Sequence, residues 1–233
     1  MSYTAQGLRL VGAMEAVTLS LVAGYVDAIG YLQLGGIYVA NMSGNSVSIG
    51  IHAARTEWAA MWQKLLPVCC YVLALILTRL TVHVGSRQGI KRIASVALTA
   101  EIALLVLFIV APGRAVGVVL TSLAMGIQAG TVTRFNHVTI FTAFVTGSLV
   151  KFADYLSAWI ISAANGPVER KQSKSFQRAA WLLSVWLAYV SGAFAGTQRF
   201  SSQGTLAVLW GCGGLACMVA LDFCCPREFE SET

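Results

Sequence analysis

The stretch AVTLSLVAGYVDAIGYLQLGG, residues Ala16–Gly36, decides the class of fold. It is almost wholly apolar, and it is long enough to cross a bilayer, whose core needs about 20 apolar residues in a helix. One acidic side chain, Asp27, interrupts it. An acid inside a span-length apolar segment is costly in lipid and marks an interior functional site by default. The segment therefore predicts a membrane helix that carries a buried carboxyl.

Further windows of the same kind follow along the chain, and together with the first they predict six spanning helices. These windows are Leu65–Val84, Ile93–Ala111, Val116–Val132, Ala179–Thr197 and Thr205–Phe223.

The composition agrees with a bilayer protein. Hydrophobic residues make up 57% of the chain, charged residues 11%, and the mean hydropathy is +0.71. A soluble domain carries roughly 25% charged residues, so this chain has too few to cover a water-facing surface. The net charge of +6 is spread over short gaps between apolar runs, which is typical of basic cytoplasmic loops and not of a nucleic-acid surface. We expect a multi-pass membrane protein.

Two windows are compatible with a membrane but rich in small polar residues. Ile37–Ala54 has Ser43-Gly44-Asn45 at its centre, and Thr139–Ala163 has Thr146-Gly147-Ser148. Each follows an apolar helix with a glycine, Gly24 in the first half and Gly126 in the second. Each is followed by a hydrophilic stretch and two more apolar windows. The pattern predicts an all-α protein of two structural repeats, residues 1–111 and 112–233, that together form one membrane domain.

Basic residues indicate how the polar windows sit in the membrane, because lysine and arginine concentrate in cytoplasmic loops. If both polar windows are re-entrant, the side of the N-terminus holds eleven basic residues and the opposite side holds four, Arg55, Lys64, Arg114 and Arg199. If both windows span, the bias is weaker. The counts favour six spans with both termini cytoplasmic. Three spans per repeat is an odd number, so the second repeat would be inverted, as in many secondary transporters.

Two motifs carry a resemblance to a known family. Gly24-Tyr25-Val26-Asp27-Ala28 followed by Val39-Ala40-Asn41-Met42-Ser43-Gly44-Asn45 resembles the signature of the YoaK family of bacterial inner-membrane proteins. Ala124-Met125-Gly126-Ile127-Gln128 followed by Val145-Thr146-Gly147 resembles its second signature. The family pattern has Thr at the place of Ser43 and often Asn at the place of Ala129. The resemblance covers nearly the whole chain and implies a membrane protein of a family without an assigned function, at most a presumed transporter.

The candidate site residues belong to the two polar windows and the helices before them. Asp27 is the leading candidate, as a proton or cation coupling group or as a carboxyl that fixes helix packing. The other candidates for a substrate or ion pathway are Asn41, Ser43, Gly44, Asn45, Gln128, Thr142, Thr146, Gly147 and Ser148. Such residue types serve ligand binding and close helix crossing equally well, so both uses stay open. For Gln128 an interhelical hydrogen bond is the favoured use.

Three further charged residues lie inside apolar windows. Lys151 and Asp154 are three residues apart, so on a helix they share a face and favour a structural ion pair, with a coupling role as the alternative. Glu101 lies in the middle of a predicted span with no local partner. It is either a second protonatable site or the partner of a basic residue on another helix.

The predicted function is a small secondary transporter or permease that works by alternating access around the two glycine-centred segments. The sequence has no HExxH, GxSxG or Walker motif and no CxxC pair, so we expect no enzyme, no cofactor and no metal site. A non-transporting scaffold or assembly protein is the main alternative, and a membrane-embedded enzyme or a channel follows it. The expected partners are the lipid bilayer and a small-molecule substrate, with no nucleic acid, and a homo-oligomer stays open.

The sidedness of two loops tests this topology. We expect topology reporters inserted near Arg55 and, in a separate variant, near Lys171 to lie on opposite sides of the membrane, because re-entrant segments invert the second repeat. The measurement is reporter activity in chains shown to insert normally. Signals from the same side would indicate eight spans and a parallel repeat.

Overall fold

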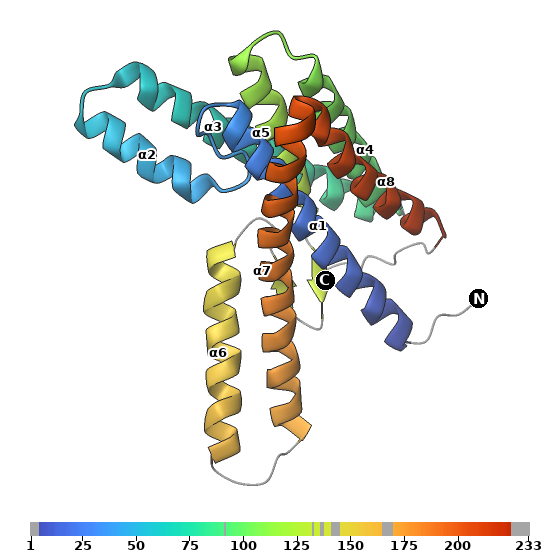
Figure 1. Cartoon of the computed structure of the whole chain (residues 1–233). Coiled ribbons are helices and arrows are strands. Elements are labelled where there is room, and N and C mark those ends of the chain that lie inside the picture. The colour runs from blue at the N-terminus through green and yellow to red at the C-terminus, as the bar shows by residue number, and fades with distance from the viewer. Residues whose placement is uncertain are drawn as a thin grey trace.

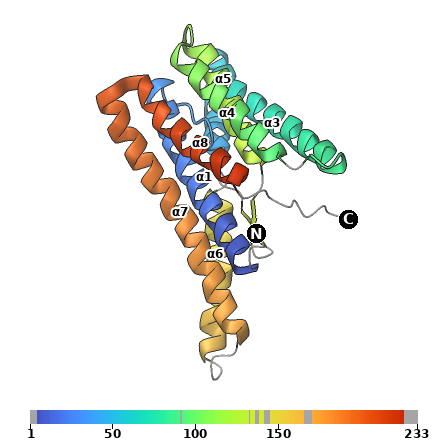
Figure 2. The ribbon, with the colours of Figure 1, turned by 90° about the vertical axis from the view of Figure 1, so that its right-hand side faces the viewer.

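The computed structural model describes residues 5–90, 92–131, 133–135, 138–140, 145–164 and 170–224, and nearly all of them are helical (Figures 1 and 2). In chain order the elements are α1 (Ala5–Gln33), α2 (Met42–Ala54), α3 (Trp58–Arg87), α4 (Ile93–Ile109), α5 (Arg114–Gly130), β1 (Thr133–Phe135), β2 (Val138–Ile140), α6 (Val145–Ala164), α7 (Arg170–Gln203), the short 3-10 helix η1 (Gly204–Ala207) and α8 (Val208–Cys224).

Each apolar window predicted as a span coincides with a helix, namely α1, α3, α4, α5, α7 and α8. Three stretches of the described chain are long and apolar enough to cross a membrane, Met14–Gln33, Trp58–Arg87 and Lys174–Phe223, and α4 and α5 are shorter apolar helices. Large apolar side chains stay exposed along one face of α3, including Leu73, Leu77 and Leu80. Lipid is the solvent that suits such a face. The chain is a helical membrane protein.

Apart from the helices, the described residues form one short hairpin. β1 and β2 form a two-stranded antiparallel hairpin in which Thr133 pairs with Ile140. It replaces the start of the predicted polar window Thr139–Ala163, of which α6 is the helical part. Val138-Thr139-Ile140 is a short run of β-branched residues, and such residues favour extended backbone.

Helices α1 and α7 run parallel and touch backbone to backbone. A Cβ at Gly24 would overlap the carbonyl oxygen of Tyr189, and one at Gly192 would overlap that of Leu21. The hydroxyl of Ser20 donates to the carbonyl oxygen of Val185 at 2.9 Å. Small residues allow this approach, which gains close packing where lipid offers no hydrophobic driving force between helices.

Helices α3 and α5 form a second parallel pair of the same kind. A Cβ at Gly126 would overlap the carbonyl oxygen of Tyr71, and a Cβ at Gly130 would lie 2.5 Å from that of Thr78. Ala74 lies beside Gly126 and is buried. The glycines on α5 therefore allow α3 to approach closely, as Gly24 on α1 allows α7 to approach.

Other contacts between the two halves of the chain join helices that run in opposite directions. On α5, Gln128 donates to the carbonyl oxygen of Leu19, near the middle of α1, whereas Gly117 lies against Leu34, beyond the end of α1. Helices α1 and α5 are therefore antiparallel.

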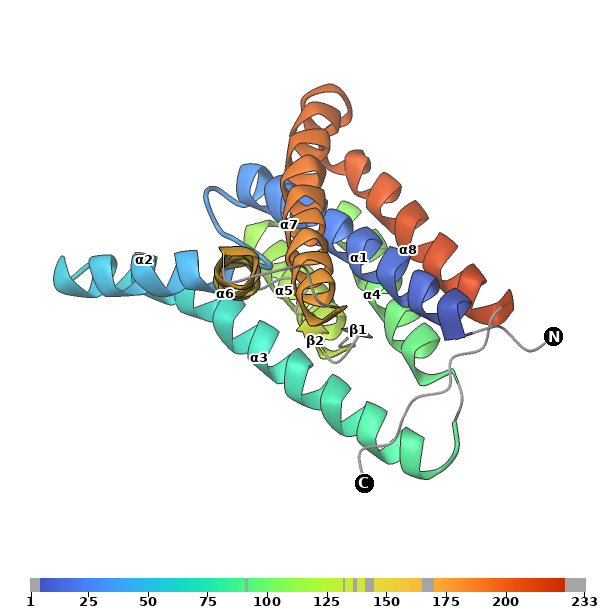
Figure 3. The same ribbon diagram turned by 90° about the horizontal axis from the view of Figure 1, so that it is seen from below.

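The helices α4 and α8 are antiparallel as well. Ser95, in the first turn of α4, donates to Asp222 near the end of α8. The guanidinium of Arg92 lies 4.3 Å from the ring centre of Phe223 at the same end. On its other side α8 lies beside α1 (Figure 3). Just before α8, the carbonyl oxygen of Ala207 in η1 accepts the hydroxyl of Tyr25 at 2.8 Å.

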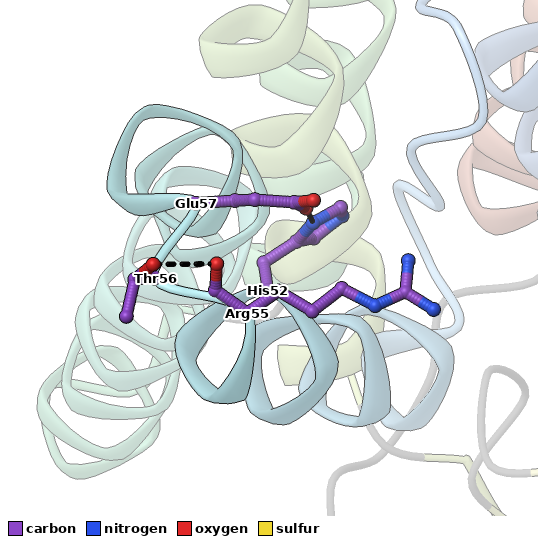
Figure 4. Close-up of polar contacts among 4 residues, drawn as sticks. All are labelled: His52, Arg55, Thr56 and Glu57. Carbon is purple, nitrogen blue, oxygen red and sulfur yellow. Dashed lines mark hydrogen bonds and ion pairs between the residues drawn. The ribbon is translucent and has the colours of Figure 1, made fainter.

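Two helical hairpins extend from this centre, α2–α3 and α6–α7 (Figure 1). Arg55–Glu57 connect α2 to α3. Across this turn Nδ1 of His52 lies 2.6 Å from a carboxylate oxygen of Glu57, and the two side chains point toward each other (Figure 4). Thr56 has a φ of 56°, in the left-handed region, and its hydroxyl donates to the carbonyl oxygen of Arg55. The pair lies at the exposed tip of the hairpin.

The backbone contact at Gly24 gives a direct test of the α1–α7 packing. We expect Gly24→Ala to lower the free energy of unfolding by about 1–3 kcal/mol, because the added methyl forces the two helices apart. Gly213→Ala on α8 is the control, since nothing lies within 4 Å of a Cβ there. It should be neutral or stabilising by up to about 1 kcal/mol, because alanine is the better helix former. The measurement is the thermal midpoint in mild detergent, and equal midpoints would contradict the packing.

Candidate functional site

The chain breaks between α1 and α2 at a pair of glycines. Gly35 and Gly36 have φ values of 63° and 78°, in the left-handed region that glycine adopts without strain. Their carbonyl oxygens accept hydrogen bonds from two cations of other helices, Arg114 of α5 on Gly35 and Lys64 of α3 on Gly36. Cations are favourable at a helix C-terminus, where unpaired carbonyls gather. The turn sends the chain back along α1.

Asp27 holds the returning chain. Its side chain is 3% exposed, in the last two turns of α1. One carboxylate oxygen accepts backbone N–H groups from Val39 at 2.7 Å and Ala40 at 2.8 Å, and a longer contact at 3.5 Å comes from Asn41. The other oxygen accepts the hydroxyl of Tyr189, on α7, at 2.6 Å. Four donors that surround one carboxyl favour its charged form and fix irregular backbone inside the bundle.

Gly30 makes room for this arrangement. A Cβ at Gly30 would lie 2.9 Å from both γ-carbons of Val39. The returning segment therefore packs directly on the backbone of α1, one turn beyond Asp27. Val39 and Ala40 are buried as a result, although they are in neither helix.

The first turn of α2 makes a second set of hydrogen bonds to the returning chain. Asn45 is fully buried, accepts the N–H of Tyr38 at 3.2 Å and donates to its carbonyl oxygen at 2.6 Å. Gly44 lies against the ring of Tyr38, 2.8 Å from where a Cβ would be. Asn41 and Ser43 bond to each other at 2.7 Å towards the surface, and Ser43 is exposed. Of the predicted pathway residues in this window, Asn45 and Gly44 face inward.

The prediction that Ser43-Gly44-Asn45 is the break itself was wrong. These residues belong to the first turn of α2 and have ordinary helical backbone. The break needs two successive residues with positive φ, and Gly35-Gly36 supply them. The glycine at position 44 is used for close approach of an aromatic ring instead.

Tyrosines complete the site, and the sequence interpretation missed them. Tyr38, Tyr71 of α3 and Tyr189 of α7 all lie within electrostatic range of Asp27. Tyr71 is 2% exposed, and its hydroxyl has no hydrogen-bond partner within the described residues. The ring of Tyr38 packs on that of Tyr31, with centres 4.7 Å apart. The site thus combines one carboxylate, bent backbone and phenol groups from three elements.

Gln128 is buried but does not join this site. Its amide nitrogen donates to the carbonyl oxygen of Leu19 at 2.6 Å, two turns before Asp27 and so about 12 Å along α1. This is the interhelical hydrogen bond favoured by the sequence. Its carbonyl oxygen is buried without a partner among the residues described.

The second polar window does not mirror the first. Thr146 and Gly147 are exposed at the start of α6, and nothing lies within 4 Å of a Cβ at Gly147. Ser148 is buried. Thr142 lies outside the described residues. The physical reason is that α6 packs chiefly on α7 and projects with it away from the Asp27 site.

The remaining charged candidates lie apart from Asp27. Lys151 is half-buried and Asp154 is exposed on α6, and their ion pair stays a prediction. Glu101 is fully buried in α4, and neither of its carboxyl oxygens has a hydrogen-bond partner within the described chain. No group of three or more metal-ligating side chains occurs among the described residues.

The hydrogen bond between Tyr189 and Asp27 can be tested alone. We expect Tyr189→Phe to lower the free energy of unfolding by about 1.5–3 kcal/mol, because it removes a donor to a buried charged group. Tyr31→Phe, which removes an exposed hydroxyl from the end of α1, is the control and should change little. Thermal midpoints in detergent measure both. A Tyr189→Phe protein as stable as the control would mean that the bond contributes nothing to the fold.

Comparison with known proteins agrees with the motifs. A family model described as "Protein of unknown function (DUF1275)" matches residues 16–221. The chain is 27% identical over 169 residues to the UPF0700 transmembrane protein YoaK of Bacillus subtilis (strain 168), and the match covers 69% of this chain and 71% of that protein. No solved structure matches the chain. The resemblance to the YoaK family is confirmed, and the chain belongs to the DUF1275 family of transmembrane proteins of unknown function.

Proposed function

We propose that the chain consists of two inverted repeats, residues 1–111 and 112–233. The antiparallel pairs α1–α5 and α4–α8 support this, because each joins helices that occupy the same place in the two halves. The parallel pairs α1–α7 and α3–α5 support it as well, since each joins the first helix of one half to the long third helix of the other.

The register of the repeats is supported by matching residues. Gly24 lies on the carbonyl of Tyr189 and Gly126 on that of Tyr71, and a Val follows each tyrosine. Ser20-Leu21 and Ser122-Leu123 stand at the same distance before the two glycines. In this register Ala129 takes the place of Asp27. That difference accounts for the hydroxyl of Tyr71, which is buried without a partner where Tyr189 has a carboxylate.

We infer that α2 is re-entrant. Its 13 residues extend only about 20 Å at 1.5 Å per residue, too short for a hydrocarbon core of about 30 Å. Lys64 and Arg114 meet at Gly35-Gly36, as expected when the end of α1, the start of α3 and the start of α5 share one side of the membrane. Both termini are then on the opposite side, which the basic residues identify as cytoplasmic.

On this architecture the function best supported is that of a small secondary transporter. One observation carries the proposal: a buried carboxylate holds bent backbone where oppositely directed halves of the chain meet. Non-helical backbone at membrane depth is tolerated only inside protein or beside a water-filled path. Transporters of inverted repeats place substrate and coupling-ion sites at such discontinuous helices. The pathway would pass Asp27, Asn45 and the tyrosines, with rocking of one half against the other as the motion.

The transporter proposal predicts solute-dependent stability and flux. Purified protein screened against a panel of bacterial metabolites should be stabilised by its substrate by about 2.7 kcal/mol when the solute is at 100 times its Kd. The same solute should enter proteoliposomes with saturation and show counterflow. Asp27→Asn should slow this flux, whereas Glu57→Gln, a neutralisation at the exposed tip of the α2–α3 hairpin, should leave it unchanged.

The outcomes separate the alternatives. Flux without saturation would indicate a channel, and chemical conversion of a solute would indicate an enzyme. Stable protein that neither binds nor carries any solute would favour a scaffold. If Asp27→Asn carried the solute at the normal rate and with unchanged pH dependence, Asp27 would have no coupling role.

A further inference from the structure

A second acid lies inside the bundle, apart from the Asp27 site. Glu101 is in the middle of α4 and is fully buried, and no hydrogen-bond donor reaches either carboxyl oxygen from the described residues. Two other buried acids, Asp27 and Asp222, differ from it. Asp27 receives backbone amides and a tyrosine hydroxyl, and Asp222 receives the hydroxyl of Ser95.

Apolar side chains flank Glu101 on its own helix. Leu98 and Leu105, three residues before and four residues after it, lie on the same face and are buried. Within the described part of the chain no cation lies within ion-pair distance of Glu101. An ionised carboxylate without partners is very costly in such surroundings, so the group holds its proton instead.

The helices packed on α4 supply few ionisable groups. On α8, Cys212 is the group whose electrostatic interaction with Glu101 is resolved, and Asp222 lies by Ser95, about 9 Å along α4 from Glu101. Between Ala115 and Gly130, α5 has no acidic or basic residue. On α3 the charged side chains and histidine towards the α4 turn are exposed: Arg79, His83 and Arg87.

We propose that Glu101 is a proton-binding site of this protein, neutral in the structure described here, and that it exchanges its proton with water when the α4–α8 interface opens. The coupling of this proton to solute movement rests on the transporter function proposed above. Protonation and exchange do not depend on that function, and they can be measured without a solute.

Asp27 and Glu101 then have different roles. Asp27 is supplied with hydrogen-bond donors and keeps irregular backbone in place through them. Glu101 has no donor among the described residues, so gaining or losing a proton changes its interaction with α8 far more. A proton released from Glu101 leaves a charge that favours an open, hydrated interface between α4 and α8.

Infrared difference spectroscopy on the full chain in lipid vesicles tests protonation, with the proton itself as the probe. We expect the C=O stretching band of a protonated carboxylic acid at neutral pH, and we expect it to move to lower frequency in D2O as the acid exchanges. The band should vanish in Glu101→Gln, an uncharged side chain of similar size. It should remain in Asp222→Asn, which neutralises the other acid of the α4–α8 interface.

The absence of such a band, or its persistence in Glu101→Gln, would overturn the proposal. A band that vanishes in Glu101→Gln but does not exchange in D2O over hours would also overturn it, because the acid would then be a permanent part of the packing. Correct folding of each variant is checked by its elution profile and thermal midpoint in detergent.

Carbodiimide labelling gives an independent readout. The carboxylic acid adds across a C=N bond of dicyclohexylcarbodiimide: its oxygen bonds to carbon, its proton moves to nitrogen, and an acyl shift gives a stable N-acylurea with the summed mass. We expect Glu101 to be labelled faster than Asp27 at neutral pH, because the reagent adds to the protonated acid and no hydrogen-bond donor among the described residues favours the charged form of Glu101. Faster labelling of Asp27 would contradict the assignment.

The coupling of the Glu101 proton to solute movement has its own test. For any solute that the wild-type protein carries, Glu101→Gln should abolish accumulation driven by a pH gradient and retain counterflow, which needs no net proton movement. Gradient-driven accumulation in Glu101→Gln would refute coupling through Glu101. If the wild-type protein carries no solute, the transporter proposal fails, while the infrared and labelling results still decide whether Glu101 binds an exchangeable proton.

Discussion

The carboxylate of Asp27 is the interaction on which the centre of this protein depends. A chain that leaves a helix inside a membrane exposes backbone N–H groups that lipid cannot satisfy. Asp27 satisfies those that follow the break, and Tyr189 of the other half completes its coordination. The same carboxylate therefore makes the irregular segment possible and ties α1 to α7. Glycine contacts at Gly24 and Gly192 bring the two helices close enough for that tie.

The two halves use one packing plan with different polar content. Glycine-mediated contacts place Tyr189 beside Asp27 and place Tyr71 within electrostatic range of the same acid. Tyr189 donates its hydroxyl to Asp27, whereas the hydroxyl of Tyr71 has no hydrogen-bond partner among the described residues.

Two buried acids in this bundle differ in the polar contacts that their surroundings supply. Asp27 and Glu101 are both mid-bundle carboxyls that sequence alone marks as costly. Amides and a phenol surround the first, and leucines and a cysteine lie near the second. Desolvation acts on both, but only Asp27 regains polar contacts among the residues described. We assign anchoring to Asp27 and proton binding to Glu101 on that difference.

Sequence by itself determined the class of protein, the positions of the apolar helices, the family, and the importance of Asp27 and Glu101, because span length and the cost of intramembrane charge are local properties. It placed the break at Gly44, because a centre of small polar residues gives the same sequence pattern whether it bends the chain or lets a neighbouring side chain approach closely. Only the tertiary structure located the break at Gly35-Gly36 and turned Thr146 and Gly147 outward. Only the tertiary structure identified Tyr71 and Tyr189 as part of the site. Their distance from Asp27 depends on contacts between helices remote in sequence, which no local pattern encodes.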